Sequence, residues 1–245
     1  MKNIPLLIGT ILGTLLLVVG ISFMFSGGSN GGADESIKVD PQVAMGDARN
    51  FKVGKSSAVV VKSPEEESAM ATDSANENSD QKMITVVEFS DFQCPACRSA
   101  AGLGKLVTDT YPGRVKFVYR HFPLDTIHPN ARNAAIAAEA VGAINKEKFW
   151  DMHDMLFENQ DQWSDAKSKK ELIDIFVTYV EKLDIDRTQF LERIDDNSVI
   201  EMVTNDSNTG TQLGVNSTPT FYVDGNKVSA QQLLSTVQSL TAGTE

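Results

Sequence analysis

The chain has 245 residues, which is enough for one large domain or for one domain with attached segments. With 41% hydrophobic and 22% charged residues, its composition is that of an ordinary globular protein. The net charge of −11 at pH 7 disfavours nonspecific binding to nucleic acid or to anionic lipid, so no nucleic-acid partner is expected.

Residues 1–26 are predicted to form a transmembrane signal anchor. No charged residue occurs from Ile4 to Phe25, and a helix of this length spans roughly 33 Å, which matches a bilayer core. No A-x-A pattern follows, so an uncleaved anchor is favoured over a cleaved signal peptide, which stays the alternative. Lys2 precedes the span, and the positive-inside rule then places the N-terminus in the cytoplasm. The expected location is the cell membrane, with a single pass and the rest of the chain extracytoplasmic.

Residues 27–82 are predicted to form a flexible acidic linker. Both "SGGSNGGADES" and "SPEEESAMATDSANENSDQK" are polar and lack aromatic residues, a composition that is typical of disordered segments. Between them, "FKVGKSSAVVVK" contains a short apolar run that fits either a strand or a part of the tether.

An α/β domain is predicted over residues 83–245. It begins with "MITVVEFS", a β-branched run typical of a strand buried on both faces. A helical segment, "CPACRSAAGLGKLVTDTY", and a second strand, "RVKFVYRHFPL", follow it and predict a βαβ unit with parallel strands. Helical periodicity then continues to about residue 212. Finally, "TPTFYVDGNKV" predicts two strands joined by an Asp-Gly turn, with a helix after them.

Cys94 and Cys97 are the only cysteines of the chain. A bridge between them closes too small a loop to stabilise a fold well, and a zinc site needs about four ligands, for which no second CxxC is present. Between a strand and a helix, however, the helix N-terminus stabilises a thiolate at Cys94, and Cys97 can attack a mixed disulfide there. The pair therefore predicts redox chemistry, with no metal and no cofactor beyond the redox-active disulfide.

Three stretches, "FSDFQCPACRSA", "FWDMHDMLFENQ" and "LGVNSTPTFYVDG", resemble the DsbA-like branch of the thioredoxin superfamily. The resemblance covers roughly residues 83 to 242. It implies a thioredoxin fold with an all-helical insertion at about residues 127–212, preceded here by the single transmembrane helix and the disordered linker. It also implies thiol–disulfide exchange on extracytoplasmic proteins.

The resemblance assigns roles to further positions. It implies that the bond between Thr218 and Pro219 is cis, that it lies beside the CxxC, and that Thr218 pairs its backbone with a substrate peptide. Glu88 corresponds to a buried acid that relays protons to and from Cys97. Taken by itself, Glu88 is either a solvent-facing residue of an edge strand or, on a central strand, a carboxyl group with a raised pKa.

Pro95 and Ala96 stand between the cysteines. Ala96 departs from the family pattern, because the most oxidising DsbA proteins carry histidine at this position. This departure puts the strength of oxidation in doubt. Among the histidines, His153 lies on an apolar helical face and is predicted to be a core residue. No catalytic role is expected for His121 or His128.

The predicted function is oxidation of cysteine pairs in exported proteins. Its expected partners are those proteins and a quinone-linked membrane protein of the DsbB or VKOR type. The alternatives are a disulfide reductase or isomerase, a copper metallochaperone that uses the two thiolates, and a binding module that has lost activity. No methionine or histidine cluster surrounds the cysteines, which argues against the metallochaperone. The intact active-site residues argue against the inactive module.

Overall fold

The computed structural model describes Asp40, Ala44, residues 50–52 and residues 83–243. The predicted membrane anchor lies outside these residues, as does most of the predicted linker. None of the helices in the described ranges is both long and apolar enough to cross a bilayer.

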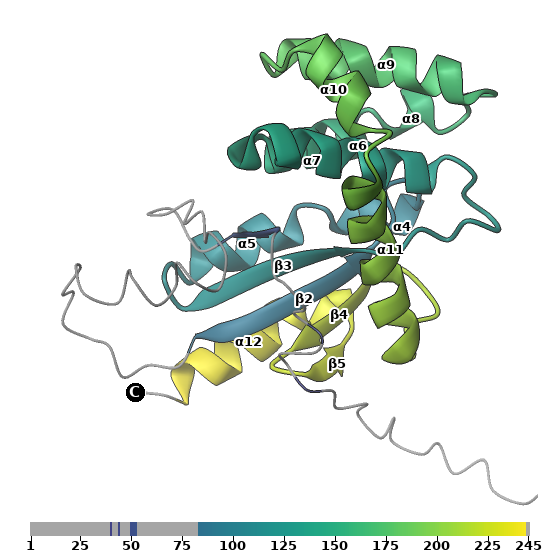
Figure 1. The fold of residues 1–245 in the computed structure, drawn as a ribbon. Helices are drawn as coiled ribbons and strands as arrows, with labels where there is room; N and C mark the ends of the chain where they lie inside the picture. Colours follow the sequence, from purple (N-terminus) through teal and green to yellow (C-terminus); the bar gives the residue numbers. More distant parts are fainter. Residues whose placement is uncertain (1–39, 41–43, 45–49, 53–82, 244–245) are drawn as a thin grey trace, which may run out of the picture. The chain divides into compact units, whose positions relative to one another are not determined.

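The described part of the chain contains one mixed sheet with the strand order β1-β3-β2-β4-β5 (Figure 1). The strands are β1 (Phe51–Lys52), β2 (Ile84–Ser90), β3 (Val115–His121), β4 (Thr220–Val223) and β5 (Asn226–Val228). Strands β2 and β3 are parallel, while the pairs β1·β3, β2·β4 and β4·β5 are antiparallel. The predicted βαβ unit is confirmed, and its first strand, β2, is the central strand of the sheet.

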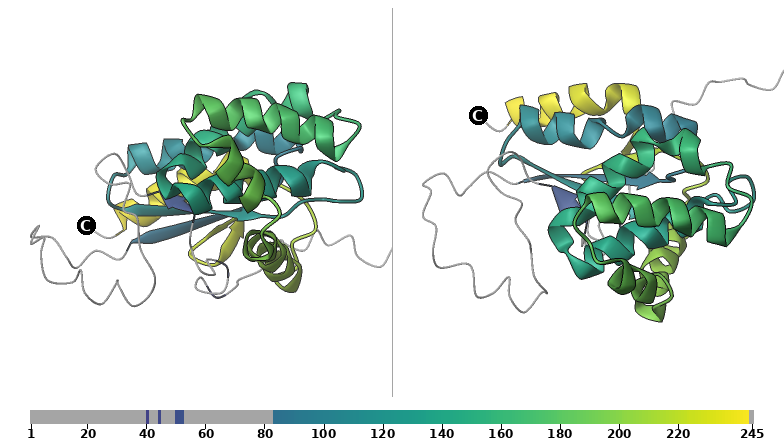
Figure 2. Two further views of the ribbon diagram at one scale, coloured as in Figure 1. Left: turned by 45° about the horizontal axis from the view of Figure 1, so that its top comes forward. Right: turned by 90° about the horizontal axis from the view of Figure 1, so that it is seen from above.

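Helices cover both faces of β2, which explains why its sequence is almost continuously apolar. Helices α4 (Pro95–Ala100), α5 (Leu103–Thr110) and α12 (Leu233–Ala242) share one core with alternate residues of the strands. The 3-10 helix η2 (Ala230–Gln232) precedes α12. On the other face, Gly210 of α11 (Asn197–Gln212) lies against Phe122 and Phe89, so close that a Cβ atom there would meet the Phe122 ring at 2.5 Å. Figure 2 shows α12 beside α4 and α5, with α11 across the sheet from them.

The chain between β3 and β4 is helical. Its further elements are α6 (Ala131–Ile144), the 3-10 helix η1 (Lys146–Lys148), α7 (Phe149–Glu158), α8 (Gln160–Trp163), α9 (Lys169–Lys182) and α10 (Arg187–Arg193). The predicted apolar faces are buried: the alanine face of α6, the Phe149 face of α7 and the Leu172 face of α9. His153 is buried on the Phe149 face of α7, as predicted. In Figure 1 these helices gather to one side of the sheet, away from β5.

The helix expected after the CxxC is divided in two. Helix α4 ends at Ala100 and α5 begins at Leu103, with Gly102 at the N-cap of α5. The break shifts the helical phase, and Leu106 of α5 is 44% exposed. Gly104 instead faces the sheet, where an added Cβ atom would lie 2.4 Å from the Phe117 ring.

The domain also includes residues from the segment assigned to the linker. Strand β1 pairs antiparallel with β3, and the Trp150 indole donates a hydrogen bond to the Phe51 carbonyl at 3.3 Å. Ala44 and Asn50 are buried. The strand lies before the apolar run Ala58–Val61, which is outside the described residues. Because β1 has two residues, it leaves no periodic signal in the sequence.

Candidate active site

The two cysteines lie at the N-terminus of α4, which follows β2 in the chain. Cys94 is the N-cap of α4, Pro95 occupies the first helical turn, and both sulfurs are free thiols. Proline suits this position because its missing N–H would be unpaired there in any case. Cys97 is completely buried and Cys94 is 7% exposed, whereas Pro95 and Ala96 are exposed. Only the Cys94 sulfur is therefore within reach of another protein.

The two thiols differ strongly in acidity. The Cys97 thiol, which donates toward the Cys94 sulfur, and the backbone N–H groups of Cys97 and Ala96 lower the pKa of Cys94 to about 5, although burial opposes them. Burial raises the pKa of Cys97 far above that of an ordinary thiol, and the neighbouring Cys94 and Glu88 raise it further. At neutral pH the reduced pair thus carries one thiolate, on Cys94, and one thiol, on Cys97.

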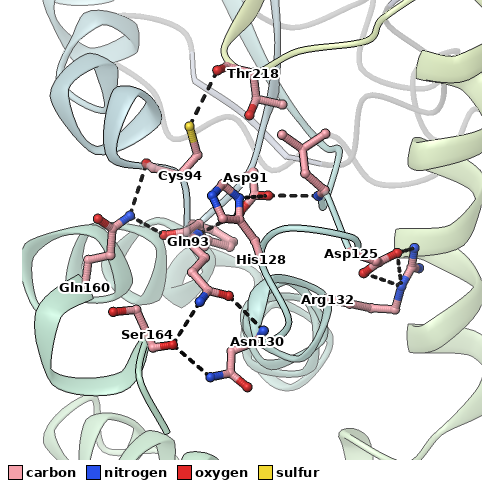
Figure 3. A network of polar contacts seen from close by, with 12 residues as sticks. Asp91, Gln93, Cys94, Asp125, His128, Asn130, Arg132, Gln160, Ser164 and Thr218 are labelled. Atoms are coloured by element: carbon pink, nitrogen blue, oxygen red, sulfur yellow. Dashed lines mark hydrogen bonds and ion pairs between the residues drawn. The ribbon is translucent and has the colours of Figure 1, made fainter.

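Thr218 and Pro219 lie next to this thiolate. The peptide bond between them is cis, as predicted, and the Cys94 sulfur is 3.5 Å from the Thr218 carbonyl oxygen (Figure 3). A groove of about 600 Å³ runs from Pro219 past Ala96. Its lining residues are Ala96, Ser99, Ala100, Leu103, Pro219, Ser229, Ala230 and Gln231.

Glu88 lies on β2 and is 1% exposed, so the expectation of a buried acid on a central strand is confirmed. Burial raises the pKa of its carboxyl group to about 8, opposed by the Ser90 hydroxyl and assisted by the charge of Cys94. The carboxyl also acts electrostatically on Cys97. The structure thus brings Glu88, Cys94, Cys97, Thr218 and Pro219 together at one site.

The sequence did not reveal the polar network that holds the CxxC turn. Gln160, the first residue of α8, donates hydrogen bonds from its amide to the carbonyl oxygens of Phe92 and Cys94, at 2.7 and 3.1 Å (Figure 3). The Gln93 amide group accepts from the backbone N–H of Asn130 at 2.7 Å and donates to the Ser164 carbonyl at 2.8 Å. The turn is therefore fixed from the helical insertion, by contacts that join residues far apart in sequence.

Asp91 anchors the same turn to the loop after β3. Its carboxylate accepts hydrogen bonds from the backbone N–H groups of Gln93 and Leu124, at 2.7 and 2.8 Å. The His128 ring nitrogen Nδ1 lies 2.8 Å from the same carboxylate (Figure 3). In this position His128 supports the loop after β3 and does not contact the Cys94 sulfur directly.

A second buried polar cluster joins the insertion to β3. The Arg120 guanidinium donates to the Asp206 carboxylate at 2.6 Å, and the Asn50 amide donates to Glu139 at 2.6 Å. The His121 ring nitrogen Nε2 lies 2.8 Å from the same Glu139 oxygen. These contacts tie α6 and α11 to the sheet, and His121 is the last residue of β3.

A thiolate at a helix N-cap, a buried partner thiol one turn further on and a cis-proline opposite them, on a thioredoxin-type sheet, define a thiol–disulfide oxidoreductase. The comparisons with known proteins agree. The model of the thioredoxin family matches residues 79–241, and the chain therefore belongs to this family. Within it, the chain falls in the DsbA-like branch.

Several solved structures share the fold. BdbD from Bacillus subtilis superposes with a TM-score of 0.61 at 22% identity, covering 86% of this chain and all of BdbD, a similarity that concerns the fold. The thiol-disulfide exchange protein alpha-DsbA2 from Wolbachia pipientis has a TM-score of 0.51 at 26% identity, over 68% of this chain and 85% of its own. A thioredoxin-like oxidoreductase from Silicibacter pomeroyi has a TM-score of 0.53 at 26% identity, over 66% of this chain and 88% of its own.

Curated relatives match over a shorter part of their length. The Na(+)/H(+) antiporter NhaA 3 of Salinispora tropica is 36% identical over 144 residues, which are 59% of this chain and 20% of the antiporter. The NhaA 1 antiporter of Salinispora arenicola is 35% identical over 166 residues, 66% of this chain and 24% of the antiporter. The chain thus spans about a fifth to a quarter of these relatives, and their transport activity is not carried over to it.

Proposed function

We propose that this protein is a membrane-tethered, extracytoplasmic thiol–disulfide oxidoreductase that oxidises cysteine pairs in exported proteins. The observation that carries the proposal is the unequal acidity of the two thiols, with a pKa of about 5 at Cys94 and a strongly raised pKa at Cys97. Stabilising the thiolate stabilises the reduced enzyme, and an enzyme whose reduced form is stabilised is an oxidant of other dithiols.

The oxidised enzyme begins the cycle with a Cys94–Cys97 disulfide. A substrate thiolate attacks the Cys94 sulfur, the more accessible of the two, a mixed disulfide forms, and Cys97 leaves and takes up a proton. The second substrate thiolate then attacks the substrate sulfur of the mixed disulfide and displaces Cys94 as a thiolate. Two electrons pass from the substrate to the enzyme. The low pKa of Cys94 speeds this last step, because a more acidic thiol leaves faster.

Glu88 exchanges a proton with Cys97, the buried cysteine of the pair. Its carboxyl group, with a pKa of about 8, holds a proton that Cys97 needs when it leaves, and its carboxylate takes the proton back when Cys97 must attack again. Solvent cannot do this directly, since Cys97 and Glu88 are both buried. Reoxidation requires an electron acceptor, which we place in a quinone-linked membrane protein of the DsbB or VKOR type.

The groove beside Pro219 would receive an extended substrate segment. Small side chains such as Ala96, Ala100 and Ala230 form much of its wall, and such a wall lets a peptide approach the Cys94 sulfur without bulky obstruction. Thr218, whose backbone lies beside that sulfur, would pair with the peptide in the manner of an added strand.

Trapping of substrates tests the proposal. In the Cys97→Ser variant, Cys94 should form mixed disulfides that no second enzyme thiol resolves, and non-reducing gels should show covalent adducts with extracytoplasmic proteins. The matched Cys94→Ser variant keeps the buried thiol and should show few adducts. Equal trapping by both variants would contradict the assignment of Cys94 as the attacked sulfur.

The direction of electron flow needs a separate measurement. Alkylation of the parent protein in cells should find the Cys94–Cys97 pair mainly oxidised. A pair that is mainly reduced in cells would instead support the reductase or isomerase alternative.

A further inference from the structure

Several buried polar atoms at and around the active site have no hydrogen-bond partner among the described residues. One is Thr218 Oγ1, beside the cysteines, and four others belong to residues on one face of the sheet: Glu88 Oε1, Ser90 Oγ, Tyr119 Oη and His121 Nδ1. A buried polar group without a partner costs about 1–3 kcal/mol, so such groups are rare and seldom gather by chance. Their concentration beside the active site calls for a functional explanation.

The sheet register places these four residues together. Glu88 and Ser90 are two positions apart on β2, so their side chains leave the same face of the sheet. In the parallel pairing of β2 with β3, Glu88 lies opposite Tyr119 and Ser90 lies opposite His121. Each of the four residues is about 1% exposed, and Cys97 packs in the same core as Tyr119.

The groups act on one another across this face. The Ser90 hydroxyl lowers the pKa of Glu88, of Cys97 and of Tyr119, although it closes no hydrogen bond in this conformation. The Glu88 charge in turn raises the pKa of Cys97 and of Tyr119. The titratable groups around Glu88 are thus Cys94 and Cys97 of α4 and Tyr119 of β3. At the far end of the cluster, His121 is held by Glu139 through Nε2.

We infer that Tyr119 and Ser90 are positioning residues that donate hydrogen bonds to the Glu88 carboxylate after Glu88 has passed its proton to Cys97. The inference rests on the proposed function, because it concerns the proton of the same thiol–disulfide reaction. One proton moves from the Glu88 carboxyl to the Cys97 sulfur when Cys97 leaves. The same proton returns when Cys97 attacks in the reverse direction.

The arrangement suits this task in both protonation states. In the described conformation the hydroxyl groups of Tyr119 and Ser90 have no hydrogen-bond partner. This suits a protonated Glu88, which offers them no charge to stabilise. Once Glu88 is ionised in this dry environment, two hydroxyl rotors on the same face of the sheet can turn toward it. Hydrogen bonds to a charged group are the stronger kind, about 1.5–3 kcal/mol.

A single-atom change tests the inference. Tyr119→Phe removes the hydroxyl and keeps the ring, whose packing on Phe92 at 5.3 Å and on His153 at 4.9 Å is unaffected. The matched control is Tyr222→Phe on β4. The Tyr222 ring packs on Phe89 of the opposite face, and its hydroxyl donates to the Leu213 carbonyl.

The measurement is the pKa of Glu88 in the reduced full chain, from the ¹³C shift of its side-chain carboxyl, with the signal assigned by its loss in Glu88→Gln. Tyr119→Phe should raise this pKa by about one to two units, the equivalent of one lost hydrogen bond to a charge. Tyr222→Phe should leave it within a few tenths of a unit. An unchanged pKa in Tyr119→Phe would overturn the inference for Tyr119.

Ser90→Ala should also raise the pKa of Glu88. This smaller change provides the test if Tyr119→Phe does not fold. An unchanged pKa of Glu88 in Ser90→Ala would overturn the role of Ser90. The titration involves no turnover. If the pKa of Glu88 shifts but the protein traps no substrates, the positioning role is supported and the proposed function is contradicted. If the protein traps substrates but the pKa does not shift, the proposed function is supported and the positioning role is contradicted.

Discussion

The Cys94 sulfur owes most of its acidity to groups within one helical turn, and the Thr218 side chain adds to it. The Cys97 thiol and the N–H groups of Ala96 and Cys97 surround it, while the Ala96 side chain points into solvent and contributes no charge or hydrogen bond. Sequence analysis could predict this part of the site, because the CxxC spacing fixes which atoms meet. The burial of Glu88 followed only from the resemblance to the DsbA-like branch, because the residues alone also allowed a solvent-facing position on an edge strand. Tyr119 and Ser90 left no such signal, because their closeness to Glu88 depends on the pairing of strands.

Glu88 should make the stability of the domain depend on pH. Its pKa is raised from 4.5 to about 8 in the folded protein, so between these values the unfolded chain loses its proton before the folded one does. The contribution of the neutral carboxyl to stability is complete below pH 4.5 and is lost as the pH rises through 8. Glu88→Gln stays neutral, so it should lose less stability on going from pH 5 to pH 9 than the parent does.

Urea unfolding of both proteins in their reduced forms at the two pH values measures this effect, and the difference should reach the order of a few kcal/mol. Reduction keeps the cysteine state equal, so that the titration of Cys94 cancels in the comparison. Parallel pH profiles for the parent and Glu88→Gln would show that the Glu88 carboxyl keeps an ordinary pKa.

At the scale of the elements, the helical insertion does more than cover the sheet. Gln160 of α8 holds the carbonyl groups of Phe92 and Cys94, and Asn130 before α6 holds the Gln93 side chain. The sequence predicted the helices of the insertion from their apolar faces, but these contacts link residues more than 35 positions apart and have no local pattern. The break between α4 and α5 also went unpredicted, because Ala100 and Leu103 keep helical spacing across Gly102.

Gln160→Ala should loosen the CxxC turn. It removes two hydrogen bonds to the carbonyl groups of Phe92 and Cys94, both buried, and should lower the free energy of unfolding by about 1–3 kcal/mol. The matched control is Gln162→Ala in the same helix, because the exposed Gln162 amide also makes two hydrogen bonds, donating to Asn159 and accepting from the Tyr179 hydroxyl, and neither involves the CxxC turn. Denaturant unfolding measures the loss in the free energy of unfolding, and amide hydrogen exchange at Cys94 measures the loosening of the CxxC turn. Equal losses in the two variants would show that the turn does not depend on Gln160.

At the scale of the whole molecule, the contacts of the site in the described part of the chain join residues between 44 and 243. The domain boundary expected at residue 83 comes too late to include Ala44 and β1, which pack against β3, since short segments of this kind carry no periodicity. The apolar segment at residues 4–25 stands outside the described residues, and its role as an anchor stays a prediction.

Removal of residues 1–26 should therefore release a domain that still catalyses exchange. The change leaves β1 and all described active-site contacts intact. The expected result is a water-soluble protein that reacts with glutathione disulfide as fast as the detergent-solubilised parent. A truncated protein that folds but reacts many-fold more slowly would argue against a separate anchor.

The reduction potential of the Cys94–Cys97 couple tests the central claim most directly. Thioredoxin has a potential of about −270 mV and the strong oxidant DsbA about −120 mV, a difference of about 7 kcal/mol at 30 mV per 1.4 kcal/mol. This protein stabilises the Cys94 thiolate through its helix N-terminus but has alanine in place of a histidine at position 96. Equilibration of the full chain with glutathione should therefore give a potential between these limits, clearly above that of thioredoxin. A potential at or below about −270 mV would contradict the assignment as an oxidant and identify the protein as a reductase.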